Sequence, residues 1–221
     1  MRRSGTLSGH GADAVFEAAV EELRCGQEQV RAARPELRFE DMPAPRTLAP
    51  FATALAVSVQ TDETEVASGR FVLLYDPAGQ PGWAGPLRVI VYIRADMEPE
   101  IVADPMVGQV AWSWLTEALE TGTAGYAEPS GTVTRVITEG FGAKREEPPA
   151  QGFELRASWS PVLVPPAGTP QGAADAPAEQ SPLGMAAHLA AWCATLCAAA
   201  GLPPLVAGVT ALRPASRRRD S

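Results

Sequence analysis

The cysteines and histidines are the first residues whose types and spacing could hold a metal ion. Cys193 and Cys197 lie one helical turn apart, so their thiolates could bind a soft metal together. A tetrahedral site needs two more ligands. His188 projects to another side of the same predicted helix, and Cys25 could join only through the tertiary fold. We therefore expect ordinary buried thiols and no metal site.

A run of acidic residues could instead offer oxygen ligands to Mg²⁺ or Ca²⁺. Its members are Asp96, Glu98, Glu100 and Asp104, and an extended backbone would place the first three on one side. Their spacing matches no known cation loop, and Asp104 is well placed to cap a following helix. A solvated connection is the favoured interpretation, and cation binding by residues 96–104 stays open as the alternative.

Acid–base and nucleophilic catalysis have few residues to draw on. His10 and His188 are the two imidazoles, and the chain has no G-x-S-x-G nucleophile elbow. Lys144 lies in FGAKR, which lacks the spacing of a phosphate loop, and no G-x-G-x-x-G dinucleotide fingerprint is present. We predict no catalytic residue and no cofactor, and the sequence favours a protein that is not an enzyme.

Arg88, Tyr92 and Arg94 alternate along LRVIVYIRAD and should share one face of a strand. Two guanidinium groups beside a phenol could bind an acidic or carboxylate ligand. An ion pair with a neighbouring strand is the more ordinary role for such arginines. Trp83, in the turn-rich DPAGQPGWAGP, is the best candidate for contact with a partner protein, although its indole could also fold back over the sheet as a lid.

Composition limits the classes of partner. The 221 residues carry a net charge of -8, which opposes nucleic-acid binding, and the short Arg217–Arg219 run is typical of a solvated tail. No charged side chain occurs from Gln180 to Leu212, but this stretch is rich in alanine and interrupted by histidine and proline, so we expect no membrane span. The N-terminal MRRSGTLSGHG lacks the apolar stretch of a signal peptide, and we expect a cytoplasmic protein.

Hydrophobic periodicity predicts the elements that must position these residues. A spacing of two predicts strands, and a spacing of three to four predicts helices. Residues 12–205 should form a single α+β domain, with a flexible Pro/Ala-rich insertion at 161–181 and disordered termini at 1–11 and 213–221. The predicted strands are 37–42, 51–60, 69–76, 87–96, 131–139 and 153–160, and the predicted helices are 13–34, 104–122 and 181–201.

The central predicted helix carries two indoles that should point apart. At about 100° per residue, Trp114 aligns with the apolar positions that face a sheet, whereas Trp112 lies near Leu115 and Leu119 on another side. The helix therefore has a broad apolar surface, of which one part should pack on the fold. We interpret Trp112, Leu115 and Leu119 as candidates for contact with a partner.

The predicted fold is a mainly antiparallel, twisted sheet of five or six strands packed with three helices. Its element order is helix, strands, helix, two strands, helix. The ordered segments GRFVLLYDPAGQPGWAGPLRVIVYIRADMEPEIVADP, VAWSWLTEALE, GTVTRVITE, ELRASWSP and HLAAWCATLCAAAGLPPL resemble an actinobacterial family defined as a domain of unknown function, number three thousand. This resemblance implies no catalytic residue, cofactor or activity.

The element order also resembles that of type III secretion chaperones and related small bacterial domains, which typically dimerise and bind polypeptide. That analogy favours a non-catalytic protein-binding or chaperone-like module, whose partner is another protein or a second copy of the chain. The alternative is a small-molecule-binding enzyme with a pocket between the sheet and the central helix. In that case the polar groups would come from Arg88, Tyr92 and Arg94 or from the acidic run.

Overall fold

The computed structural model describes residues 8–122, 125–146, 149–162 and 183–205. Most of the predicted insertion at 161–181 lies outside the described residues, and so do residues 1–7 and 213–221 of the predicted disordered termini. In order, the elements are α1 (Ser8–Ala33), β1 (Leu37–Asp41), β2 (Phe51–Thr61), β3 (Thr64–Tyr75), β4 (Leu87–Asp96), α2 (Pro99–Ala103), α3 (Val107–Thr121), β5 (Tyr126–Thr138), η1 (Gly142–Lys144), β6 (Ala150–Pro161) and α4 (Met185–Ala199).

The six strands form one antiparallel sheet in the order β1-β2-β3-β4-β6-β5. The predicted α+β class and antiparallel sheet are confirmed. Successive side chains on a strand point to opposite faces, so the register sorts every strand into two sets. On β4, Leu87, Val89, Val91 and Ile93 are buried in the core, whereas Arg88, Ile90, Tyr92 and Arg94 point to the other face.

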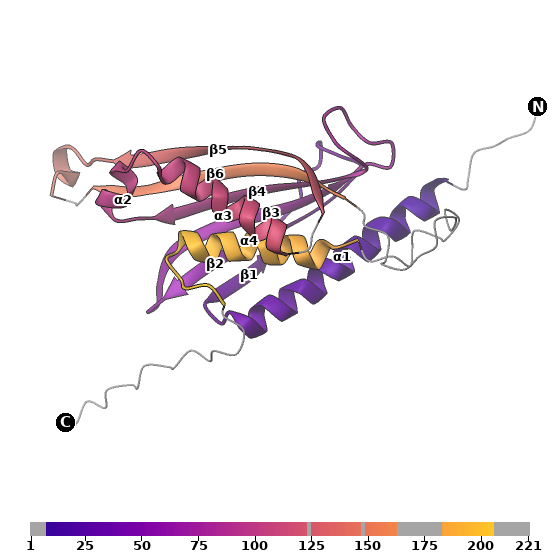
Figure 1. Cartoon of the computed structure of the whole chain (residues 1–221), viewed down its shortest axis with the longest axis horizontal. Helices are drawn as coiled ribbons and strands as arrows, with labels where there is room; N and C mark the ends of the chain where they lie inside the picture. The colour runs from indigo at the N-terminus through magenta and orange to yellow at the C-terminus, as the bar shows by residue number, and fades with distance from the viewer. Residues whose placement is uncertain (1–7, 123–124, 147–148, 163–182, 206–221) are drawn as a thin grey trace, which may run out of the picture.

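The long helices form a layer on one face of the sheet, with α4 between α1 and α3 (Figure 1). No residue of α4 is charged, and ten of its fifteen residues are buried. Trp192 of α4 is fully buried, and its ring packs on Phe71 with the ring centroids 5.6 Å apart. Gly69, two residues before Phe71 on β3, permits this approach because it has no side chain.

Several boundaries differ from the sequence predictions. α1 begins at Ser8, within the segment expected to be disordered, and β3 begins at Thr64, directly after a tight turn. That turn holds Asp62 and Glu63 at positive φ, a conformation that aspartate adopts more readily than β-branched residues do. The short helix α2, within the acidic run, was not predicted. Its five residues are too few to show a helical apolar period.

Asp104 ends α2 and precedes α3 instead of serving as the first cap of a helix that starts at Pro105. Its side-chain Oδ1 accepts a hydrogen bond of 2.8 Å from the Met106 N–H, and its carbonyl accepts one from Val107. The carboxylate thus stabilises the turn that leads into α3. The predicted end of this helix is confirmed, because Gly122 is its C-cap residue.

We expect Gly69→Ala to destabilise the fold through the contact between α4 and the sheet. A Cβ atom at this position would lie 2.7 Å from Trp192 Cζ2 and 2.6 Å from the Tyr92 carbonyl oxygen. Such overpacking should lower the free energy of unfolding by about 1–3 kcal/mol, measured by urea denaturation. Gly108→Ala is the matched control, since a Cβ there meets only Val133 Cβ, at 4.0 Å. Equal stability losses in the two variants would contradict this prediction.

Candidate functional site

The face of the sheet opposite the helix layer carries a polar cup, which we define by Arg38, Arg70, Arg94, Tyr92 and the floor residues between them. Two neighbouring rows of the strand register build it. One row runs Arg38, Ser58, Ser68, Arg94, and the next runs Ala56, Arg70, Tyr92, Arg156. The small side chains of β2 and β3 form the floor, and longer ones rise around a cavity of about 350 Å³.

The charge of the cup comes from three arginines and two glutamates, Glu40 and Glu65. Arg38 is partly engaged, because its Nη1 donates to the carbonyl of Pro35 at 2.6 Å. No described residue forms a hydrogen bond or ion pair with the side chain of Arg70 or Arg94. Two exposed guanidinium groups therefore keep their donors free for a ligand.

Arg156 and Glu154 form an ion pair beside the cup. The Arg156 Nη2 donates to Glu154 Oε2 at 2.7 Å, and the guanidinium carbon lies 5.5 Å from the Tyr92 ring centroid. Burial and the neighbouring Glu154 both raise the pKa of Tyr92, so its phenol stays protonated at neutral pH. Although Glu154 is directly opposite Arg94 in the register, it is already paired with Arg156.

Arg88 has a different environment from Arg94, although the two share a strand face. It is 8% exposed, and burial lowers its pKa. Its guanidinium donates to the Ser158 hydroxyl at 2.7 Å, to the Glu128 carbonyl at 3.1 Å and to Ser160 at 3.3 Å. These partners hold β4, β5 and β6 together, so Arg88 stabilises the sheet. The expected cross-strand ion pair is absent among the described residues for both Arg88 and Arg94.

Trp83 lies half-buried within its own loop. The loop cavity around it is lined by residues between 77 and 86. The backbone N–H of Trp83 donates a hydrogen bond to the backbone carbonyl of Gln80. The loop is tied down at two points. The Ala84 N–H donates to the Ser160 hydroxyl at 3.0 Å, and the Gln80 amide donates to the Leu48 carbonyl at 3.0 Å. Contact of Trp83 with a partner remains a prediction.

The partner-binding assignment of Leu115 and Leu119 is wrong for this conformation, because these side chains are 1% and 0% exposed in the core. They continue the buried stripe of α3 that starts at Val107 and Ala111. Trp112 is half-buried and packs against Gly131 of β5. The sequence shows two apolar arcs on α3, and periodicity alone could not tell which one faces the sheet.

The second indole of α3, Trp114, points to a different neighbourhood, which includes Phe153. It also lines an apolar groove of about 720 Å³ between α1 and α3, with α4 as the floor. We call this the helix groove. Its other members come from the C-terminal half of α1, from α3, from α4 and from the segment after α4, and they include Val30, Ala118, Ala190, Ala194, Cys197, Leu202 and Leu205.

The groups best suited to catalysis are buried in the core, although Cys193 and Cys197 also lie along the helix groove. His188 is 1% exposed, and its Nδ1 accepts a hydrogen bond of 3.1 Å from Trp159 Nε1. Burial lowers its pKa to about 4. Burial also raises the pKa of the Cys193 thiol and raises that of Cys197 to about 11, so both are protonated at neutral pH. Neither thiol is activated as a nucleophile.

The acidic run has no ligand geometry to offer. Within the described residues no group of three or more His, Cys, Asp or Glu side chains converges on a point that could hold a metal ion. Asp104 accepts a hydrogen bond in the turn before α3. Glu98 is the N-cap residue of α2, and Glu100 lies in the first turn of that helix.

Helix α4 and the other described helices are too short or too polar to cross a membrane.

Sequence reasoning identified part of the cup. It placed Tyr92 and Arg94 on one strand face, but it missed Arg38 and Arg70, which come from two other strands. The alternation of apolar and polar residues along β1 and β3 could have indicated that Arg38 and Arg70 point away from the core. Only the strand order and the register bring them beside Arg94.

The fold and the cup define a class of α+β protein in which helices cover one sheet face and a polar, arginine-bearing face stays open. The chain belongs to the family described as "Protein of unknown function (DUF3000)", whose model matches residues 12–210. No curated protein and no solved structure matches the chain.

The buried imidazole gives a pH-dependent contribution to stability. Because burial lowers the pKa of His188 from 6.5 to about 4, the unfolded chain binds a proton that the native state excludes between these values. Its contribution is complete above pH 6.5 and is lost as the pH falls toward about 4, by at most roughly 3 kcal/mol. Unfolding by urea at pH 7.5 and pH 5 measures the loss.

His188→Gln is the control, because glutamine can accept the Trp159 hydrogen bond and does not titrate. The variant should lose less stability than the wild type between the two pH values. Identical pH profiles would show that other groups cause the acid sensitivity.

Proposed function

We propose that the protein is a non-catalytic, cytoplasmic protein-binding module whose polar cup binds an extended, acidic segment of a partner polypeptide. The observation that carries this proposal is a pair of guanidinium groups, those of Arg70 and Arg94, on the sheet face opposite the helices, for which the described part of the chain supplies no hydrogen-bond or ion-pair partner. Three free thiols, two of them buried, suit a reducing compartment such as the cytoplasm.

Charge complementarity identifies the chemistry of the partner. The chain as a whole is acidic, with a net charge of -8, yet its cup has one more arginine than glutamates. Arginine forms bidentate hydrogen bonds with carboxylates, and arginine and tyrosine are enriched where proteins bind each other. The acidic remainder of the chain repels polyanions such as nucleic acid. A short acidic segment interacts mainly with the charges of the cup, because salt screens more distant charges.

The spacing of the cup suits an extended peptide. Arg38 and Arg94 lie three strand intervals apart in one row, which corresponds to about 14 Å. Residues i and i+4 of an extended chain are separated by a similar distance of about 13 Å. Carboxylates at positions i, i+2 and i+4 can therefore approach Arg38, Arg70 and Arg94 while the backbone crosses the small floor residues.

The alternative of an enzyme with a pocket between the sheet and α3 has weaker support. Leu115 and Leu119 fill that space together with core residues of the sheet, and Arg88, Tyr92 and Arg94 lie on the opposite face. Among the described residues, the titratable groups that line the cup with the two unpartnered arginines are Arg38, Glu40, Glu65 and Tyr92, and the nearby Glu154 is paired with Arg156. Tyr92, with its raised pKa, is a poor base at neutral pH.

A fluorescent peptide with glutamate at three alternate positions, separated by valine, tests the proposal by anisotropy titration. We expect binding to the wild type that weakens with added salt, and a loss of roughly tenfold or more in affinity for Arg70→Gln and for Arg94→Gln. A peptide with glutamine in place of glutamate should bind at least tenfold more weakly, because it lacks the charge-assisted hydrogen bonds.

Arg24→Gln is the matched control, since Arg24 is an exposed arginine on α1 whose ion-pair partner within the described ranges is the exposed Glu21. This variant removes the same charge from a different surface and should bind the peptide like the wild type. Equal losses of peptide affinity in Arg24→Gln and Arg94→Gln would show that binding depends on the net charge of the protein, and would contradict a binding site at the cup. Citrate that binds as tightly as the peptide would favour a small-molecule ligand instead.

A further inference from the structure

The two edges of the sheet differ in how well they are protected against pairing with another chain. β1, at one edge, has five residues, and three of them are charged: Arg38, Glu40 and Asp41. β5, at the other edge, has thirteen residues, and its stretch Ser130–Thr138 carries one charged side chain, Arg135. Short, charged edge strands discourage pairing with another strand, and long, neutral ones permit it. The β5 edge, which Figure 1 shows at the outer side of the sheet, is therefore suited to strand pairing.

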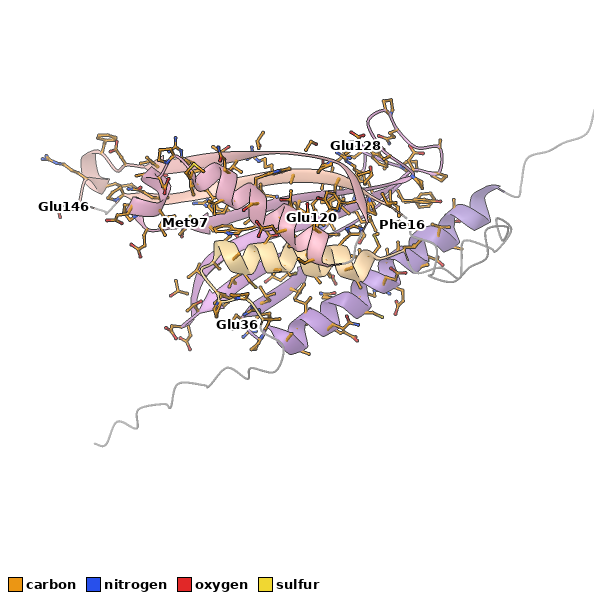
Figure 2. All side chains as sticks on the ribbon, viewed as in Figure 1. Phe16, Glu36, Met97, Glu120, Glu128 and Glu146 are labelled. Carbon is orange, nitrogen blue, oxygen red and sulfur yellow. The ribbon has the colours of Figure 1, made fainter. Side chains whose placement is uncertain are left out.

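Ser130–Thr138 is a regular strand along its whole length. Its nine residues pair in continuous register with β6. The register shift of β5 comes before this stretch, between Ala127 and Ser130, and Figure 2 labels Glu128 there. Six of the nine residues are β-branched, as is typical of strands: Thr132, Val133, Thr134, Val136, Ile137 and Thr138. A further strand can therefore pair with all nine residues without a bulge.

The outer backbone groups of this stretch are available to a further strand. Every second residue of an edge strand directs its N–H and C=O groups away from the sheet. Among the described residues, those outside β6 form no hydrogen bond with the backbone of Ser130–Thr138. Seven of the nine residues are exposed. The Arg135 side chain turns toward α2, where its Nη1 donates to the Val102 carbonyl at 3.5 Å, so its charge does not block the edge.

We propose that Ser130–Thr138 pairs in antiparallel orientation with the same segment of a second copy of the chain, so that two sheets join into one. A two-fold axis perpendicular to the sheet generates this arrangement and places both helix layers on the same side. Pairing of all nine residues puts the axis at Thr134, which lies opposite its own symmetry mate. Gly131 of one copy then lies opposite Ile137 of the other.

The segment is complementary to itself in this register. No like charges meet, because Arg135 lies opposite Val133 of the second copy. Paired residues are separated by an even number of positions in the sequence, so both point to the same face of the joined sheet. Thr134 meets Thr134, and threonine pairs are favourable across antiparallel strands. This self-complementarity favours a second copy over an unrelated strand as the occupant of the edge.

The pairing of Gly131 with Ile137 also covers two exposed apolar groups. Ile137 is 62% exposed, and Trp112 of α3 is half-buried beside Gly131. A Cβ atom at Gly131 would lie 2.6 Å from Trp112 Cζ3, so the glycine admits the indole. Directly opposite side chains have Cβ atoms about 5 Å apart, which brings Ile137 of the second copy beside Trp112. The interface lies at a different place from the cup, and the inference does not depend on the proposed function.

Charges introduced at position 134 test both the interface and its register. The wild type should sediment as a dimer, with twice the chain mass of 23.2 kDa. Thr134→Lys and Thr134→Glu should each weaken association by roughly tenfold or more, because like charges then lie directly opposite each other. An equimolar mixture of the two variants should form the dimer again, since lysine then lies opposite glutamate.

Thr64→Lys is the matched control, since Thr64 is an exposed threonine in the hairpin of β2 and β3, away from β5. This variant should sediment like the wild type. A wild type that stays monomeric as its concentration is raised would overturn the inference. Dimers that persist in Thr134→Lys would also overturn it, because association would then use another surface. A mixture of the two variants that stays monomeric would overturn the register.

Disulfide trapping locates the two-fold axis by a second route. In a Cys25→Ser background, Thr134→Cys should link two chains on mild oxidation, because directly opposite Cα atoms lie about 4.5–5.5 Å apart, within the range of a disulfide. Thr132→Cys is the control, because the two copies of position 132 lie four residues apart along the strands, or about 13 Å. It should link at least roughly tenfold more slowly. Equal rates for the two variants would overturn the inference.

Discussion

The contact between α4 and the centre of the sheet is the constraint on which the rest of the structure depends. Trp192 enters the core over Gly69, and its Nε1 finds no acceptor among the described residues. An unsatisfied buried N–H costs about 1–3 kcal/mol, so the burial of the indole and its packing on Phe71 must outweigh that loss. A larger side chain at Gly69 would lift α4 away from the sheet and weaken both effects.

The position of α4 fixes the other two long helices. α1 and α3 flank it, and the Glu22 carboxylate of α1 accepts hydrogen bonds from the N–H groups of Leu183 and Met185 at the start of α4. Thr195 of α4 donates to the Trp114 carbonyl of α3 on the other side. Because these helices bury their apolar surfaces around α4, the layer forms on one face of the sheet. The opposite face is left to polar side chains and loops.

Alternation along the strands was sufficient to predict the sheet, since both the buried and the polar set of β4 follow from its period of two. The helix faces were harder, because α3 is apolar on two arcs and α4 on nearly all sides, so the leucines of α3 were assigned to the wrong environment. The roles of Arg88 and Arg94 were beyond the sequence, because they depend on which hydroxyls and carboxylates neighbouring strands place beside them.

The difference between these two arginines shows why strand order governs the chemistry of the open face. Arg88 lies where Ser158, Ser160 and the carbonyl of Glu128 meet, so neutral acceptors satisfy its guanidinium. Arg94 faces Glu154, which should be a favourable cross-strand pair. Arg156, two residues from Glu154 on the same strand, pairs with that carboxylate instead, and its guanidinium lies over the Tyr92 ring. One short local ion pair thus leaves Arg94 with its charge directed toward the cup instead of into the sheet.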